Sequence, residues 1–154
     1  VMWLIEEVMP LLPKQYHLTV VGARPYRELL DAQNERITVT GFVEQVTPYF
    51  EECLCLVAPL VLGAGIKVKV LEAMSAAIPV LTNEIGIEGI GAEDGKEYYH
   101  CVSAKDYARR IVELGDNPQL VTSMGNAAKQ YVREHFDLER KYQELLVKMQ
   151  QLDS

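Results

Sequence analysis

The chain has 154 residues, 49% of them hydrophobic and 24% charged, which is typical of one globular domain. Its 22 acidic residues outnumber its 15 basic residues, and the net charge of −7 argues against a nucleic-acid partner, because such partners select a basic surface. The sequence contains no apolar run near the roughly 18 residues of a membrane-spanning helix, and its three cysteines lack the C-x-x-C spacing of a structural zinc site.

The first predicted element is a helix over residues 1–12, which Pro10 and Pro13 bring to an end. Its apolar side carries Trp3, Leu4, Val8 and Leu11. Neither an N-cap residue nor an initiator methionine precedes this helix, so we expect the chain to be part of a longer protein.

Short apolar, β-branched runs then alternate with helical patterns. The predicted strands cover residues 17–21, 37–40, 54–58, 79–82 and 97–102. Predicted helices cover residues 24–32 and 66–77, and another starts with Thr47 as N-cap and Pro48 in its first turn. This rhythm is typical of parallel βαβ units. We therefore predict an α/β fold, a doubly wound parallel sheet of about five or six strands with helices on both faces.

The rest of the chain has helical patterns. Ser103 and Asp106 resemble a capping box at the start of one helix, and Asn117 with Pro118 starts a second. A third helix, from residue 138 on, carries an apolar stripe made of Leu138, Tyr142, Leu145, Leu146 and Met149. We expect one domain over residues 1–154, with an α/β core over 1–135 and a C-terminal helix over 136–154.

Residues 59–89 carry the pattern that points to function. Gly63 and Gly65 lie between a predicted strand and a predicted helix, where the unpaired amides of the first helical turn can bind an anion. Lys67 adds a positive charge in that turn, and the Glu72 carboxylate can accept hydrogen bonds from two vicinal ribose hydroxyls. This combination describes a nucleotide pocket; a tight turn followed by a solvated lysine and glutamate is the alternative.

The same segment resembles the donor-binding motif of family 4 glycosyltransferases, which are retaining enzymes of the GT-B fold. The match lies in Glu72-Ala73-Met74, followed by small residues and Pro79-Val80. Further similarity to the family covers residues 20–22, 40–43, 59–60, 86–89 and 131–136, so the resemblance extends over essentially the whole chain.

The resemblance implies that this chain is the Rossmann-like, C-terminal half of a GT-B enzyme, without the N-terminal acceptor domain. It implies transfer of a sugar from a nucleotide-diphosphate donor to a saccharide or lipid-linked acceptor, in polysaccharide biosynthesis, with retained configuration and without a metal or other cofactor. The isolated chain is then expected to turn over no donor. We expect a cytoplasmic protein; peripheral attachment of the longer protein to the inner face of the membrane stays open.

Carried onto this sequence, the resemblance gives Lys67 and Arg24 as the catalytic residues, which meet the charge on the diphosphate. The implied donor-binding residues are Gly22, Phe42, Val43, Gly63, Ala64, Gly65, Ile66, Lys67 and Glu72. Ala64 stands where most members of the family have a glutamate, which leaves the contact to the donor sugar open.

For four candidate residues a plainer interpretation stands beside the functional one. Arg24 precedes Pro25 and can equally be an ordinary surface residue, and Phe42 alone is more often part of a core. Glu84 and Glu88 flank the Gly86 loop, where we favour solvated side chains.

The main alternative to an enzyme is a nucleotide-diphosphate-binding module without turnover. A flavodoxin-like or receiver-like domain is disfavoured, because no acidic cluster ends the first strands. The apolar stripe of the last predicted helix has few surfaces left to cover in one small domain, so we expect self-association, by helix exchange or by stripe-to-stripe packing.

Overall fold

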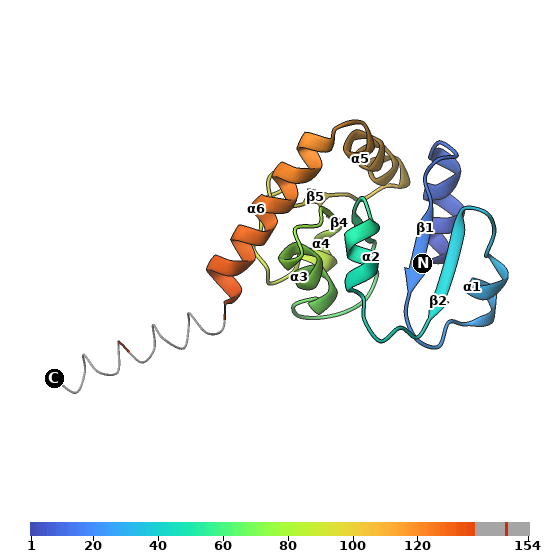
Figure 1. Ribbon diagram of the computed structural model, residues 1–154, viewed down its shortest axis with the longest axis horizontal. Helices are drawn as coiled ribbons and strands as arrows, with labels where there is room; N and C mark the ends of the chain where they lie inside the picture. The colour runs from blue at the N-terminus through green and yellow to red at the C-terminus, as the bar shows by residue number, and fades with distance from the viewer. Residues whose placement is uncertain (138–146, 148–154) are drawn as a thin grey trace.

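Short parallel strands and the helices between them make up the part of the chain that the computed structural model describes, residues 1–137 and 147 (Figure 1). The strands are β1 (Leu18–Val21), β2 (Ile37–Gly41), β3 (Leu56–Ala58), β4 (Val80–Thr82) and β5 (Tyr99–His100). Each predicted strand is therefore present, and the parallel α/β fold is confirmed.

The strands form two sheets instead of the single sheet that we predicted. β1 pairs with β2, and β3, β4 and β5 pair in that order, all of them parallel. β3 is shorter than the predicted strand, because Leu54 and Cys55 lie outside it and use their side chains to pack against the core. The two sheets share a hydrophobic core without sharing a hydrogen-bond ladder.

The helices are α1 (Arg27–Asp31), α2 (Thr47–Glu52), α3 (Val68–Ser75), α4 (Glu84–Ile87), α5 (Ala104–Asp116) and α6 (Pro118–Phe136). α1 begins three residues later than predicted, since Arg24 has a positive φ of 53°. Thr47 is the first residue of α2 rather than its cap, and no side chain caps that helix. The capping box of Ser103 and Asp106 on α5 is confirmed.

The N-terminal segment is helical, but it consists of a π-helix, η1 (Leu4–Val8), followed by a 3-10 helix, η2 (Met9–Leu11). Because neither has the 3.6-residue period of an α-helix, the buried side shifts along the sequence. Leu4 and Val8 are buried as predicted, whereas Trp3 and Leu11 are exposed, and Met9 and Leu12 are buried instead.

Arg36 attaches the N-terminal segment to the start of β2. Its Nε donates a hydrogen bond to the Tyr16 carbonyl at 3.0 Å, and its Nη2 donates to the carbonyls of Pro13, Leu12 and Met9 at 3.1, 3.3 and 3.4 Å. One of these carbonyls belongs to Leu12, the C-cap residue of η2, and the fork of N–H donors on a guanidinium can reach several carbonyls at once.

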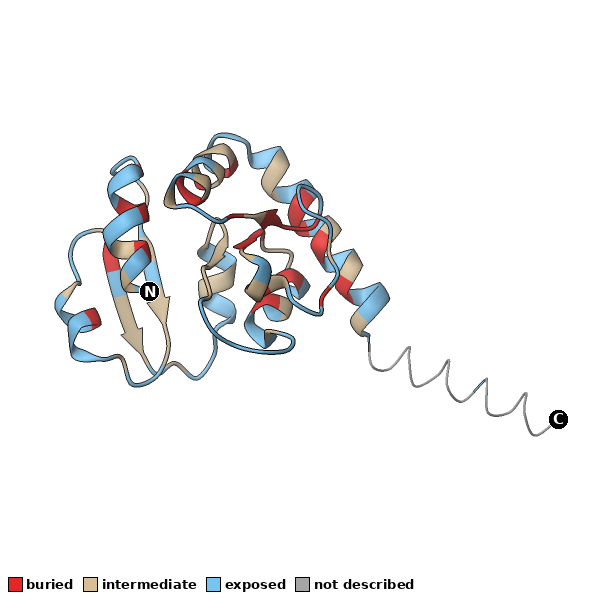
Figure 2. Cartoon of the chain, turned by 180° about the vertical axis from the view of Figure 1, so that it is seen from behind, coloured by how far each residue is buried: buried red, intermediate tan, exposed pale blue. Residues whose placement is uncertain are grey.

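The core consists of two clusters of buried side chains, concentrated in β4, β5 and the inner faces of the surrounding helices (Figure 2). The second cluster joins α3, β4 and α6 through residues such as Met74, Val80 and Ala128. α6 crosses α3 closely at Gly125, where an added Cβ would stand 2.0 Å from the Ala77 carbonyl oxygen. This contact fixes α3, and with it the loop that precedes α3.

The predicted third C-terminal helix and its apolar stripe of Leu138, Tyr142, Leu145, Leu146 and Met149 lie outside the described residues. The expected self-association through that stripe therefore stays a prediction.

Candidate functional site

The loops that follow the parallel strands β1, β2 and β3 gather along the lower edge of the molecule in Figure 1. Gly22 follows β1, Phe42 and Val43 follow β2, and the longest of these loops follows β3. The Gly22 amide donates to the Gly41 carbonyl at 3.3 Å, which joins the first two loops. The carboxyl edge of parallel strands is where ligands bind in open α/β folds, so most of the predicted site residues lie at the expected edge.

The loop between β3 and α3 depends on two glycines with backbone angles that other residues rarely adopt. Gly63 has a φ of 130° and Gly65 a φ of 75°. A Cβ on Gly63 would stand 3.1 Å from Cε of Lys67, so the lysine side chain folds back under the loop because Gly63 has no side chain. The glycine pair thus positions a cation beneath the backbone of the loop.

Lys67 is the N-cap residue of α3, with extended backbone, and not a member of its first turn as we predicted. The helix begins at Val68, two residues later than expected, since the loop conformation set by the glycines continues through Lys67. Its Nζ donates to the Gly65 carbonyl at 2.5 Å and lies 3.6 Å from Oε2 of Glu88. The Lys67 side chain is only 16% exposed, so the ammonium is held among protein groups at the loop.

The backbone amides of this loop supply further positive character. Within the described part of the chain, none of the amides from Gly63 to Lys69 donates a hydrogen bond to a protein acceptor. The last of them belong to the first turn of α3, where the helix dipole adds partial positive charge. A run of free amides around a fixed ammonium is suited to binding a group with several negatively charged oxygens.

Glu72 lies on the outer side of α3, because the helix turns Val70, Ala73 and Met74 toward the core. Its carboxylate is exposed and makes no ion pair or hydrogen bond with another of the described residues. It is therefore available to accept hydrogen bonds from a ligand that extends along α3 from the loop.

Two other predicted residues, Arg24 and Phe42, lie on the β1–β2 side of the same edge. Arg24 is exposed, and no ion pair or hydrogen bond joins its guanidinium to the residues that the structure describes. Phe42 is 76% exposed, which contradicts the core interpretation, whereas Val43 is half-buried. The predicted residues thus fall into two groups, one after β1 and β2 and the other after β3.

Glu88 lies at the site through a contact that we did not predict from the sequence. Its side chain is exposed, as we expected, but its carboxylate also pairs with the Lys67 ammonium. The neighbouring Ile66 packs over Gly89, so the loop after α4 lies against the loop before α3. Glu84 is exposed as well, but it forms no ion pair with any described residue.

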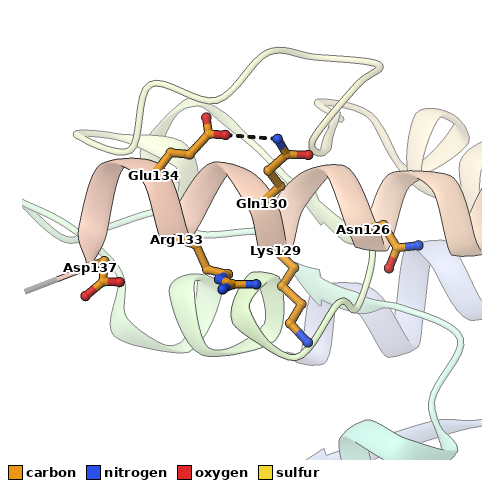
Figure 3. A pocket seen from close by; sticks show the side chains of 6 residues that line it. All are labelled: Asn126, Lys129, Gln130, Arg133, Glu134 and Asp137. Atoms are coloured by element: carbon orange, nitrogen blue, oxygen red, sulfur yellow. Dashed lines mark hydrogen bonds between the residues drawn. The ribbon is translucent and has the colours of Figure 1, made fainter. Parts of the chain in front are cut away.

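The larger of the two described cavities lies elsewhere, on the C-terminal half of α6 (Figure 3). It is an open depression of about 480 Å³, lined by Asn126, Lys129, Gln130, Arg133, Glu134 and Asp137. All six come from α6 or the residue after it, and Gln130 and Glu134 hydrogen-bond to each other at 2.9 Å. A shallow surface on one helix lacks the convergent groups of a binding site, so we consider the loop before α3 the better candidate.

Two negative findings apply to residues 1–137 and 147. None of the helices there combines the length and the apolar character that crossing a bilayer requires. No three His, Cys, Asp or Glu side chains in this part of the chain gather in an arrangement that could hold a metal ion.

Comparison with known sequences gives a family and one curated relative. Residues 1–117 match the family described as glycosyl transferases group 1. An "uncharacterized 44.6 kDa protein in cps region" of Klebsiella pneumoniae is 20% identical over 152 residues, which cover 91% of this chain and 39% of the relative.

Comparison with solved structures gives the same fold. Anabaena Alr3699/HepE in complex with UDP superposes with a TM-score of 0.83 at 16% identity, over 97% of this chain and 44% of that one. The same protein with UDP-glucose gives 0.81. The C-terminal domain of the group 1 glycosyl transferase LpcC from Francisella tularensis gives 0.60 at 16% identity, over 71% of this chain and 58% of that domain. The chain spans less than half the length of HepE and of the Klebsiella relative.

Proposed function

The chain belongs to the group 1 glycosyl transferases, with the fold of the C-terminal domain of GT-B enzymes, and we propose that its carboxyl edge binds the nucleotide-diphosphate part of a sugar donor. The observation that carries this proposal is the loop before α3, where the free amides from Gly63 to Lys69 lie in one segment with the half-buried Lys67 ammonium. Few ligands other than a phosphate chain match such a concentration of donors.

In this proposal each group has a defined task. The amides and Lys67 bind the diphosphate and stabilise the negative charge that develops on it as the bond to the sugar breaks. Glu72, exposed on the same helix, accepts hydrogen bonds from the two ribose hydroxyls. Arg24 adds a second positive charge from the β1 side, and the exposed face of Phe42 with the backbone of Val43 lies against the base.

The proposal extends to the longer protein to which such a domain belongs. There we propose transfer with retained configuration to a saccharide or lipid-linked acceptor, held by a second domain, in the assembly of a polysaccharide. Lys67 and the loop amides supply the positive charge that the leaving diphosphate needs, so we propose that transfer requires no metal. Since the acceptor must be held against the donor in near-attack geometry, this chain alone should release no sugar from it.

Binding experiments test the proposal directly. A thermal-shift screen with UDP, GDP and ADP and with UDP-glucose, GDP-mannose and ADP-glucose should raise the melting temperature for at least one pair, by linkage. Calorimetry then gives Kd values for that pair. The absence of binding by every nucleotide would contradict the proposed function.

Replacing Glu72 by alanine tests the ribose contact. Loss of a charged hydrogen-bond acceptor should cost about 1–3 kcal/mol, or roughly 5- to 150-fold in Kd. The 2′-deoxy analogue, which lacks one of the two hydroxyls, should lose less when Glu72 is replaced. Glu52→Ala, which removes an exposed carboxylate from α2, is the matched control and should leave both Kd values unchanged. Equal nucleotide binding by Glu72→Ala and the parent chain would contradict the ribose role.

A further inference from the structure

The ion pair between Lys67 and Glu88 joins two loops at the candidate site and has no part in the function proposed so far. Oε2 of Glu88 lies 3.6 Å from Nζ of Lys67, and the Glu88 side chain is 53% exposed, whereas that of Lys67 is 16% exposed. The ammonium has three donors, one of which bonds the Gly65 carbonyl. A diphosphate that reaches Lys67 therefore meets the Glu88 carboxylate beside it.

The loop that carries Glu88 is held in place by contacts of other residues, and not by the Glu88 carboxylate. Asn83 caps α4 by accepting a hydrogen bond from the Gly86 amide at 3.1 Å, and its side chain donates to the Leu60 carbonyl at 2.6 Å. Thr82 Oγ1 donates to the Ala58 carbonyl at 2.7 Å. Within the described residues, the ion pair with Lys67 is the single polar contact of the Glu88 side chain. The charge on Glu88 is thus free to act on the site.

We infer that Glu88 is the resident counter-ion of Lys67, and that it makes the site bind the released nucleoside diphosphate less tightly, relative to the sugar donor, than Lys67 alone would. This inference rests on the proposed function. Glu88 is a positioning residue in this account, because it acts through the Lys67 ammonium and through its own charge, without touching the reacting carbon.

The reason lies in the change of charge during transfer. The bond from the anomeric carbon to the diphosphate breaks with its electron pair left on the phosphate oxygen. The acceptor oxygen forms the new bond to that carbon, and its proton passes to solvent. The released terminal phosphate, whose second pKa is about 6, is then largely ionised at pH 7 and carries nearly one more negative charge than the donor did. Repulsion from Glu88 therefore acts more strongly on the product than on the donor.

The test compares Glu88→Gln with the parent chain by calorimetry. The amide keeps a hydrogen-bond acceptor for Lys67 but removes the charge. The probes are the nucleoside, the nucleoside diphosphate and the sugar nucleotide of the pair selected from UDP and UDP-glucose, GDP and GDP-mannose, or ADP and ADP-glucose. We expect the Kd of the nucleoside diphosphate to fall about fivefold, that of the sugar nucleotide to fall less, and that of the nucleoside to stay constant.

Glu84→Gln is the matched control, since it removes the same charge one helical turn earlier from a side chain without an ion pair among the described residues. It should leave unchanged the ratio between the Kd of the nucleoside diphosphate and the Kd of the sugar nucleotide. Glu88→Ala is the second variant and should shift that ratio in the same direction as Glu88→Gln, with circular dichroism to show that each variant is folded.

The outcomes separate the inference from the proposed function. A parent chain that binds the pair, together with an unchanged ratio in Glu88→Gln and Glu88→Ala, would overturn the role of Glu88 alone. The same holds if Glu84→Gln shifts the ratio as much as Glu88→Gln does. A parent chain that binds none of the probes would overturn the proposed function, and the role of Glu88 with it.

Discussion

Replacing Lys67 by methionine should weaken binding of a nucleoside diphosphate far more than binding of the nucleoside. Methionine keeps most of the side-chain volume that packs under Gly63, although it loses the hydrogen bond that Lys67 donates to the Gly65 carbonyl. The loss is that of a charge-assisted hydrogen bond, about 1.5–3 kcal/mol, which corresponds to a Kd roughly 10- to 150-fold higher. The nucleoside has no phosphate, so its Kd should stay within a factor of about two.

The structure adds a second part to this prediction. Without Lys67, the Glu88 carboxylate has no counter-ion and repels the diphosphate, so the double variant Lys67→Met with Glu88→Gln should bind more tightly than Lys67→Met alone. Titration calorimetry on the four proteins of this cycle measures the coupling. Lys129→Ala, in the depression on α6, is the control and should change neither Kd. Equal losses for nucleoside and nucleoside diphosphate in Lys67→Met would refute the reasoning and leave Lys67 as a structural residue.

The remaining predictions concern the scaffold. Gly125→Ala would place a methyl group 2.0 Å from the Ala77 carbonyl oxygen, so α6 must move away from α3. Denaturant unfolding should then show a free energy of unfolding that is lower by about 1–3 kcal/mol. An unchanged unfolding midpoint would show that the two helices are not in close contact. Burial raises the pKa of all three thiols, and to about 12 for Cys55 and Cys101. Alkylation at pH 8 followed by mass spectrometry should therefore modify Cys53 first and the fully buried Cys101 last. Because the pKa values of Cys55 and Cys101 lie above the ordinary 9.0, the contribution of these two thiols to the free energy of unfolding should be constant below pH 9, and it should fall as the pH rises from 9 toward 12.

The sequence predicted the parts of the site that follow from local rules. Gly63 and Gly65 between a strand and a helix indicate a loop with unusual backbone angles. The position of Glu72 on the outer side of α3 follows from helical periodicity. The strand positions followed from apolar, β-branched runs in the same way. The starting residue of α3 was wrong, since the loop conformation extends as far as Lys67 and no residue type marks that limit.

Features that depend on contacts between distant segments could not be predicted from local sequence rules. Glu88 meets Lys67 because two loops lie side by side in space, and nothing in the residues around either one states that pairing. The division into two sheets depends on which strands pair with each other, and apolar character alone does not determine that pairing. In the N-terminal segment, the π- and 3-10 turns replaced the period that our assignment of its buried side assumed.

The central claim is that the carboxyl edge, and above all the loop before α3, is where a nucleotide-diphosphate donor binds. Titration of the ¹⁵N-labelled chain with the nucleoside diphosphate selected by the thermal-shift screen, followed by amide NMR spectra, tests it most directly. The account predicts that the largest shifts fall on the amides of residues 63–69, with smaller shifts near Gly22 and Phe42. Shifts centred instead on residues 126–137 of the α6 region, around Lys129 and Arg133, would contradict it.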